Sequence, residues 1–529
     1  MDVKETRNKA GTKEWAGLAV LVLSCVLVSM DMSVLFVALP FLTADLEPSS
    51  SELLWIMDAY GFLLAGLLIT MGTLGDRIGR RRLLLTGALG FGVASVLAAV
   101  STSPGTLIAA RALLGAAGAT LAPSTLSLIR NMFHDTQERA AAVGLWTAGF
   151  AGGAALGPII GGALLEHFWW GSVFLVNVPV MLLLLVLGPL LLPEYRDPEP
   201  GRFDVLGAVL SLVAVLGIVY GIKQAAEHGL GWAPAAYVAA GLVVGGGFLY
   251  RQRVIANPMI DLDLFRSRRF GVSMVTDGLA TFALVGFSLF TSQFMQLVLG
   301  MGPLESALWS LPTFLVMPVG VAAATVLAPR IGKPNVMVIG LAVSVAGYAA
   351  LALIGTDSGS GHLIGALAVV SVGIGGVVAV VTDVILSSAP PERAGSASAM
   401  SETAAEFGGA LGIAVLGSIG TAVYRTTLTD NAPDGLSPAQ LDTARDTLGA
   451  AVDTAATLPK GSGEALRQAA FNAFTREMRI TAAVSAALLT GVAIVVAILL
   501  RETATEVAAR RKTAAGSATT TEAANEPVG

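Results

Sequence analysis

Charged residues are scarce in this chain. Only 13% of its 529 residues are Asp, Glu, Lys or Arg, whereas 54% are hydrophobic. A soluble domain carries about 25% charged residues, and the mean hydropathy here is +0.74. We therefore expect neither an ordinary soluble protein nor a nucleic-acid partner. The shortage of charge is explained if most of the chain lies in a lipid bilayer.

Cysteine, histidine and nucleotide-binding loops are scarce or missing as well. Cys25 is the single cysteine, so no disulfide forms within the chain, and the four histidines are scattered. The Gly-x-x-x-x-Gly-Lys-Ser/Thr pattern of a phosphate-binding loop does not occur. We therefore expect no metal, no cofactor and no enzymatic activity. We therefore do not expect this chain alone to pump at the expense of ATP.

The chain has long apolar runs instead. A membrane-spanning helix needs roughly 20 apolar residues, and the sequence contains fourteen such runs. They do not alternate between apolar and polar residues, as the strands of a spanning β-barrel would. The sequence therefore predicts an all-α integral membrane protein with fourteen transmembrane helices, at Trp15–Pro40, Leu53–Gly75, Leu83–Ser101, Thr106–Ile129, Ala140–Leu165, Gly171–Leu192, Asp204–Lys223, Ala233–Tyr250, Gly271–Leu299, Pro303–Leu327, Val336–Ile354, Leu363–Ser388, Ser396–Tyr424 and Ile480–Leu500.

Apart from the long loop at 425–479, the Lys and Arg residues of the loops lie in alternate loops. If the amino terminus is cytoplasmic, the loops on that side carry Lys or Arg, and the short loops on the other side carry none. This asymmetry predicts a multi-pass protein of the plasma (inner) membrane with both termini in the cytoplasm. Lys223, near an outer end, is the one exception.

Two loops repeat one pattern. Asp76-Arg77-Ile78-Gly79-Arg80 follows the second run, and Pro329-Arg330-Ile331-Gly332-Lys333 follows the tenth. The echo predicts two six-helix bundles related as parallel repeats. The predicted division is an amino-terminal bundle at 1–192, two additional helices with linkers at 193–270, a carboxy-terminal bundle at 271–501 with an extracellular hairpin at 425–479, and a cytoplasmic tail at 502–529.

Acidic residues inside the apolar runs are the first candidate functional residues. A carboxylate in hydrocarbon is costly and is rarely placed there without a role in moving something. Asp31 is the clearest case, and Arg111, within the fourth run, is its obvious partner. The pair either lets conformation decide when Asp31 holds a proton or is a static structural ion pair. Similar acids recur at Asp58, Asp277, Asp383, Glu402 and Glu406.

The other acids differ in their surroundings. Glu402 and Glu406 lie four residues apart, so they share a helix face and repel each other when both are charged. A lipophilic cation entering a cavity could displace a proton from them, or one of them could simply bond a neighbouring helix. Asp58 is either a coupling acid or solvent-exposed at the outer mouth. Asp277 and Asp383 lie near inner ends, where shallow hydration is an alternative to a role in transport.

Two glycine-containing segments suggest moving parts. The loop from Gly72 to Arg80 could latch the inner face through Asp76 and Arg77, or its arginines could only fix topology, with the gate residues being Gly72, Asp76, Arg77, Gly79 and Arg80. In the fifth run, glycines every four residues line one face and let a second helix approach closely. This face is a packing seam at least, and we interpret it as a sliding surface between bundles, formed by Gly149, Gly153, Gly157 and Gly161 with Pro158 beside them.

Aromatic rings and the long outer loop complete the candidates. Rings offer flat faces to planar or quaternary cations, although most aromatics in such a protein are packing. The candidates are Tyr60, Trp146, Phe150, Phe287, Phe290 and Phe407. Ser437-Pro438 reads as a helix start within the outer loop, which forms either a solvated helical hairpin or a lid.

Together these motifs resemble the major facilitator superfamily, in its fourteen-helix drug:proton antiporter branch of QacA/LfrA-like multidrug efflux transporters. The likeness covers nearly the whole chain. It is carried by Gly72–Arg82, Arg111–Gly118, the Gly149–Gly162 antiporter pattern, Met30–Pro40, Ser401–Gly408 and the outer hairpin.

The resemblance implies the major facilitator fold and proton-coupled export of lipophilic cations, such as quaternary ammonium compounds, dyes and antiseptics, by a monomer in the bilayer. It implies proton or cation sites at Asp31, Asp58 and Glu406, with Glu402 beside them. Some relatives carry an acid on the tenth helix for dications, and here that helix has only Glu305, at its outer end. Dedicated export of one antibiotic or metabolite on the same fold is the alternative, and a nutrient importer is disfavoured by the fifth-helix pattern.

Overall fold

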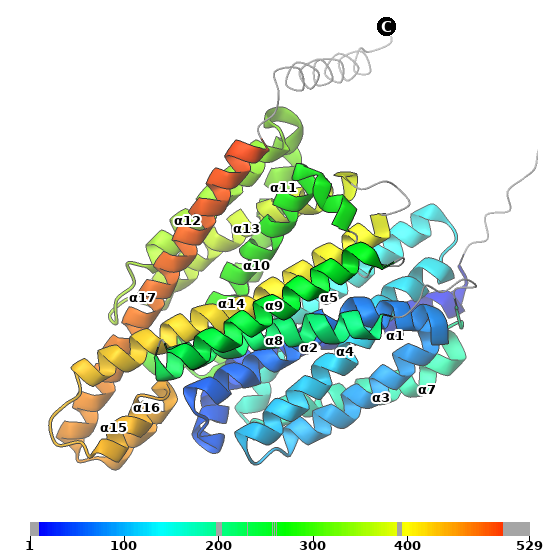
Figure 1. Ribbon diagram of the computed structural model, residues 1–529. Helices are drawn as coiled ribbons and strands as arrows, with labels where there is room; N and C mark the ends of the chain where they lie inside the picture. The colour runs from blue at the N-terminus through cyan, green and yellow to red at the C-terminus, as the bar shows by residue number, and fades with distance from the viewer. Residues whose placement is uncertain are drawn as a thin grey trace, which may run out of the picture. The chain divides into compact units, whose positions relative to one another are not determined.

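The computed structural model describes residues 10–196, 204–229, 231–255, 258, 260, 262–388 and 394–500. The predicted tail at 502–529 lies outside these residues. The described chain is helical (Figure 1), with α1 at Thr12–Leu46, α2 at Ser50–Ile78, α3 at Arg80–Ala99, α4 at Pro104–Met132, α5 at Thr136–Leu165, α6 at Ser172–Leu175, α7 at Asn177–Leu191, α8 at Val205–His228, α9 at Trp232–Val254, η1 at Leu262–Arg266, α10 at Arg268–Gln293, η2 at Phe294–Val298, α11 at Pro303–Ile331, α12 at Lys333–Leu351, α13 at Ser360–Ser388, α14 at Ala394–Asp430, α15 at Pro438–Ala444, α16 at Leu448–Thr457 and α17 at Lys460–Leu499.

The predicted spans are confirmed. Within the described residues, fourteen helical segments are long and apolar enough to cross a membrane. Each overlaps one predicted run, with α6 and α7 together forming one span and α10 continuing through η2. The fold is therefore an all-α membrane protein, as the composition predicts.

Side-chain caps fix where several helices begin. Ser49 and Glu52 form a capping box at the start of α2, and Ser103 caps α4 with Pro104 in its first turn. Ser437 caps α15 and Pro438 opens it, which confirms the predicted helix start. Helix α14 continues to Asp430 and α17 begins at Lys460, so both helices extend into the segment predicted as the outer hairpin.

The chain forms two compact units. Unit 1 comprises Met1–Ile260, Val285–Leu311 and Gly409–Glu477, and unit 2 comprises Asp261–Leu284, Pro312–Gly408 and Met478–Gly529. In unit 1, α1 packs on α5, α2 on α4, and α3 on α4 and α7, whereas α12 packs on α13 in unit 2. The division into bundles at 192 and 270 stays a prediction.

Unit 1 contains a set of close contacts that we call the hairpin-side seal. A Cβ added at Gly61 of α2 would lie 3.0 Å from the Cβ of Ala410 on α14, and one added at Gly417 would overlap Leu54. Gln296 in η2 donates a 3.0 Å hydrogen bond to the carbonyl oxygen of Val37 on α1. The ends of α10 and α14 that lie toward the α15–α16 hairpin are thus packed on the first two helices.

The two repeated loops share a backbone conformation. Gly79 (φ 110°) ends α2 and begins α3, and Gly332 (φ 93°) stands between α11 and α12. This left-handed region favours glycine because a Cβ is strained there. The repeated sequence pattern therefore corresponds to the same kind of tight turn between two helices, formed at Gly79 and again at Gly332.

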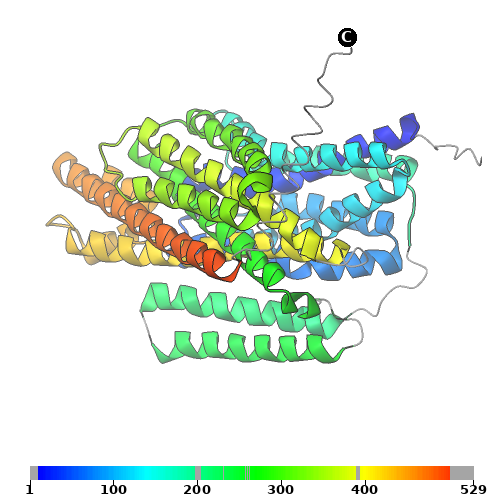
Figure 2. The ribbon, with the colours of Figure 1, turned by 90° about the horizontal axis from the view of Figure 1, so that it is seen from above.

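Helices α8 and α9 form an antiparallel pair (Figures 1 and 2). Asp204 caps α8 through the Gly207 amide, and it also binds the Arg251 guanidinium at 2.8 Å and the Gln252 amide at 3.2 Å. Burial raises the pKa of Asp204, but these hydrogen bonds and the Arg251 charge outweigh it and hold the pKa below its usual range. Asp204 thus joins the two helices at one end.

Candidate transport site

Asp31 and Arg111 form a buried ion pair in unit 1. Arg111 Nη1 on α4 lies 2.6 Å from Asp31 Oδ2 on α1, and both side chains are almost inaccessible to solvent. Arg111 Nε also donates to the carbonyl oxygen of Ile56, and its guanidinium lies 4.7 Å from the centre of the Tyr60 ring. The predicted partnership of the two residues is confirmed, while their role in coupling stays a prediction.

Asn177 holds the other oxygen of Asp31. Its amide nitrogen, at the start of α7, donates to Asp31 Oδ1 at 3.0 Å and contacts Ser95 Oγ at 3.2 Å. Both carboxylate oxygens of Asp31 therefore have fixed donors from other helices. Sequence reasoning missed Asn177, although an asparagine inside an apolar run is the kind of polar residue that bridges helices in a membrane.

Asp58 has a basic partner that sequence reasoning also missed. Lys223 on α8 places its Nζ 2.7 Å from Asp58 Oδ2, and the two side chains are 1% and 0% exposed. The ammonium also lies 4.0 Å from the centre of the Trp55 ring. Asp58 is thus not solvent-exposed at a mouth. The signal for the pair was Lys223 itself, the lone basic residue near an outer helix end.

Glu402 and Glu406 differ from these paired acids. Both lie on α14 in unit 2 and are half-buried. Among the basic residues that the structure describes, none forms an ion pair with either carboxylate. The i,i+4 spacing puts them on one helix face. They therefore stay two uncompensated acids.

Asp277 joins this acidic region, and Asp383 does not. Asp277 on α10 is buried, and it accepts a 2.8 Å hydrogen bond from Ser401, the residue before Glu402. Its burial differs from the shallow hydration considered for it. Asp383 is 60% exposed and pairs with Lys333 at 2.7 Å. Gly278 and Gly408 bring α10 and α14 together, because a Cβ added at Gly408 would overlap the Gly278 backbone.

The candidate aromatics are spread over both units. Tyr60 lies against Arg111, and Trp146 stacks on Phe150 with ring centres 6.2 Å apart. Trp146 Nε1 also donates to Thr125 Oγ1 at 3.0 Å. The remaining three are Phe287 and Phe290, which are buried and in edge contact in unit 1, and Phe407, which is half-buried in unit 2.

The glycine face of α5 packs against α1. A Cβ added at Gly149 would lie 2.7 Å from a Val22 methyl, and one at Gly153 would overlap the Val26 backbone. One at Gly157 would lie 2.8 Å from the Met30 carbonyl oxygen, and Gly161 faces Val34 beyond Pro158. The predicted packing seam is confirmed, and sliding along it stays a prediction.

The segment that follows α7 contacts the start of α3, directly after the predicted inner-loop gate. Arg80 is buried and Arg77 is exposed, whereas the side chain of Asp76 lies outside the described residues. Arg81 Nη1 donates to the carbonyl oxygen of Leu192 at 2.9 Å, and Arg81 and Arg82 lie within 3.8 Å of Glu194. Gly72 lies opposite Pro123 of α4.

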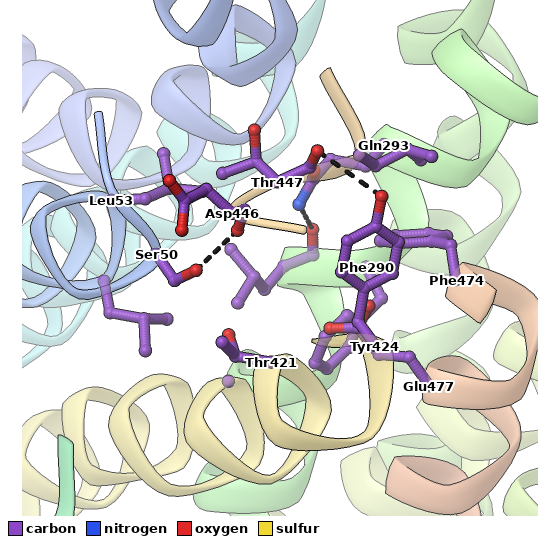
Figure 3. Close-up of a pocket in the computed structure, with 14 residues that line it drawn as sticks. Ser50, Leu53, Phe290, Gln293, Thr421, Tyr424, Asp446, Thr447, Phe474 and Glu477 are labelled. Carbon is purple, nitrogen blue, oxygen red and sulfur yellow. Dashed lines mark hydrogen bonds between the residues drawn. The ribbon is translucent and has the colours of Figure 1, made fainter. Parts of the chain in front are cut away.

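A pocket lies beneath the hairpin in unit 1 (Figure 3). Tyr424 donates to the carbonyl oxygens of Ala444 and Thr447, and Ser50 donates to that of Asp446, so hydroxyl groups hold the 444–447 segment over the pocket. Glu477, which is 6% exposed, and Asp446 are its ionisable acids, and the rest of the lining is Leu53, Leu54, Leu289, Phe290, Gln293, Gly417, Thr421, Leu448 and Phe474. Glu477 was missed because it precedes the last predicted span.

The sequence of this chain matches a known protein family and several known proteins. The family model described as Major Facilitator Superfamily matches residues 21–413. The chain is 45% identical over 494 residues to the multidrug efflux pump LfrA of Mycolicibacterium smegmatis, a match that covers 93% of this chain and 98% of that protein.

Two further relatives and one solved structure are also similar to this chain. The methyl viologen resistance protein SmvA of Salmonella typhimurium is 36% identical, over 87% of this chain and 93% of its own length. The tetracenomycin C resistance and export protein of Streptomyces glaucescens is 33% identical, over 84% and 82%. The inward-facing, unoccupied structure of a bacterial homologue of the human lysosomal transporter Spinster matches with a TM-score of 0.64 and 15% identity, covering 94% of this chain and 100% of that one. At that identity the structural match shows the fold alone.

Proposed function

This chain belongs to the major facilitator superfamily, and from that premise we propose that it exports lipophilic organic cations in exchange for protons, by alternating access across the plasma membrane. The observation that carries the proposal is the distribution of charge. Asp31 and Asp58 are each balanced by a buried basic residue, whereas Glu402 and Glu406 have no basic partner among the described residues.

Uncompensated acids suit an exchange of cations. Two carboxylates on one helix face repel each other when both are charged, and a proton on either relieves the repulsion. A cationic substrate supplies the same relief, so proton and substrate compete for one acidic site. Phe407 on the same helix offers a ring face to the cation. Asp277 accepts a hydrogen bond from Ser401, the residue before Glu402, and so adds a third carboxyl group to this region.

The hairpin-side seal supports alternating access. Its contacts between α2 and α14 are apolar, such as Gly61 with Ala410, and a hydrogen bond from Gln296 to the Val37 carbonyl oxygen joins η2 to α1. Such contacts separate at low cost compared with ion pairs in hydrocarbon. Release of substrate toward the hairpin side would therefore proceed by opening this seal.

The names of the relatives support the substrate class. Two are known as a multidrug efflux pump and a methyl viologen resistance protein, and methyl viologen is an aromatic organic dication. A third is named for export of and resistance to a single antibiotic, tetracenomycin C. Dedicated export of one compound is thus the second candidate, and a panel of substrates separates the two.

The test uses proteoliposomes with an imposed pH gradient. Ethidium or tetraphenylphosphonium transport is measured for the native protein and for Glu402→Gln/Glu406→Gln, with Glu305→Gln, an exposed acid at the start of α11, as the matched control. We expect gradient-driven transport to be lost in the double variant and kept in the control. Transport that persists in the double variant, or that ignores the gradient in the native protein, would overturn the proposal.

A further inference from the structure

Lys223 is the residue of α8 that the proposed mechanism leaves unexplained. It is a basic residue near the hairpin-side end of a membrane-spanning helix and is only 1% exposed. An ionisable residue in hydrocarbon is expensive and needs a stated partner. Its position is unusual as well, because the other basic residues of the short loops lie on the opposite side.

Two side chains of α2 hold its ammonium group. Asp58 Oδ2 lies 2.7 Å from Lys223 Nζ, and the Trp55 ring centre lies 4.0 Å away on the same helix. A second contact joins α8 to α2 further along both helices, where a Cβ added at Gly66 would overlap Leu212. Lys223 and Leu212 are separated by about 16 Å along the helix at 1.5 Å per residue. The two contacts thus lie about three turns apart on α8.

Helix α9 follows α8. Asp204 ties the two together through Arg251 and Gln252, and Gly241 allows α9 to approach the Ala214 backbone closely. Among the described residues, the Lys223–Asp58 ion pair attaches these two helices to α2. Helix α2 also makes the apolar part of the hairpin-side seal with α14.

We propose that Lys223 is a positioning residue that fastens α8 and α9 to α2 through Asp58, so that this pair moves with α2 when α2 separates from α14. Separating α2 from α8 would leave an ammonium and a carboxylate unpaired in a sealed, apolar place, which is strongly unfavourable. The contacts between α2 and α14 in the hairpin-side seal are apolar, Gly61 with Ala410 and Leu54 with Gly417, so parting them leaves no charge unpaired. The chemistry of the two interfaces decides which one opens.

Pairs of cysteines that each link α2 to a neighbouring helix test the proposal. Gly66→Cys/Leu212→Cys joins α2 to α8, and Gly61→Cys/Ala410→Cys joins α2 to α14, with Leu54→Cys/Gly417→Cys as a second pair should the first fail to fold. Cross-linking is induced by an oxidant, followed on gels and reversed by dithiothreitol. The single native cysteine is buried, and single-cysteine variants serve as controls.

We expect the α2–α8 cross-link to leave cation export unchanged and the α2–α14 cross-link to abolish it until reduction. Export lost reversibly on α2–α8 cross-linking would show that these helices must part, and would overturn the proposal. The export assay depends on the proposed function, whereas cross-link yield does not. If the native protein showed no export but α2 and α8 still cross-linked efficiently, the proposed export function would be overturned. The contact between α2 and α8 would still stand.

Variants of the ion pair test the role of Lys223 directly. In the Gly66→Cys/Leu212→Cys protein, we expect Lys223→Met to lower the rate of cross-linking severalfold, and Lys223→Arg to restore it. Adding Asp58→Asn to Lys223→Met should recover much of the thermal stability, because the lone charge is removed. Lys333→Met is the matched control, since its pair with Asp383 is as short but exposed. Equal cross-linking in Lys223→Met and in the native protein would contradict the fastening role.

Discussion

The side-chain amide of Asn177, at the first residue of α7, donates a 3.0 Å hydrogen bond to Oδ1 of Asp31 on α1. The Arg111 guanidinium binds the other oxygen of the same carboxylate. Three helices therefore meet on one acid, α1, α4 and α7. Reorienting any of them requires these bonds to be remade.

Asn177→Leu should destabilise the protein. The change removes a donor from a buried carboxylate oxygen, which costs about 1–3 kcal/mol. Thermal unfolding of the purified protein in detergent measures it. Asn431→Ala is the control, because Asn431 is exposed and bonds only its own helix at Thr427. Equal melting temperatures for the two variants would contradict the bridging role of Asn177.

Arg111→Met should be the more damaging change. It leaves Asp31 buried without a cation, and removing one partner of a buried ion pair costs about 3–5 kcal/mol in soluble proteins. Adding Asp31→Asn should recover part of the loss, because the uncompensated charge disappears. The comparison of single and double variants in thermal unfolding measures the coupling. A double variant less stable than Arg111→Met would show that the charges are not coupled.

Gly153→Ala should disturb the seam between α1 and α5. The added methyl would overlap the backbone of Val26, so the helices must move apart, at a cost of about 1–3 kcal/mol. Gly152→Ala, one residue away on the same helix, meets nothing within 4 Å and controls for helix propensity. Thermal unfolding and dye export are compared for both. If the Gly153→Ala protein were as stable and active as Gly152→Ala, close packing of α1 on α5 would not be needed for export.

Asp204→Asn should loosen the junction of α8 and α9, and the effect should depend on pH. The folded-state pKa of Asp204 is held below its ordinary value of 3.8. The stabilisation is therefore fully present above the unfolded pKa and is lost as the pH falls through the folded one. We expect the native protein to be more stable than the variant at pH 7 and the difference to shrink below about pH 4. Unfolding curves across this range provide the measurement, and a pH-independent difference would contradict the ionic role.

Tyr424→Phe should release the segment above the pocket of Figure 3. The single hydroxyl proton is shared between the carbonyl oxygens of Ala444 and Thr447, and the loss of one hydrogen bond costs about 0.5–1.5 kcal/mol. Hydrogen–deuterium exchange should quicken at 444–451 and stay unchanged in α12. Tyr250→Phe, an exposed tyrosine on α9, is the control.

The sequence alone determined the fourteen spans, the helical class, the placement of Asp31, Asp58 and Asp277 within apolar runs, and the glycine face of α5. These are local properties, because the length of an apolar run and a four-residue period are read within one helix. The partnership of Asp31 with Arg111 was also predictable, since both are charges inside apolar runs that need a partner.

Only the tertiary structure decided which acids pair with a basic residue and which have no such partner among the described residues. Asp58 meets Lys223, Asp31 meets Asn177, and Asp277 meets Ser401, each pair joining residues more than a hundred positions apart. Such contacts depend on how each helix is rotated about its axis and on which neighbour it faces. The hydropathy of a single segment predicts neither the rotation of a helix nor its neighbour. Apolar side chains are equally stable against lipid and against another apolar helix.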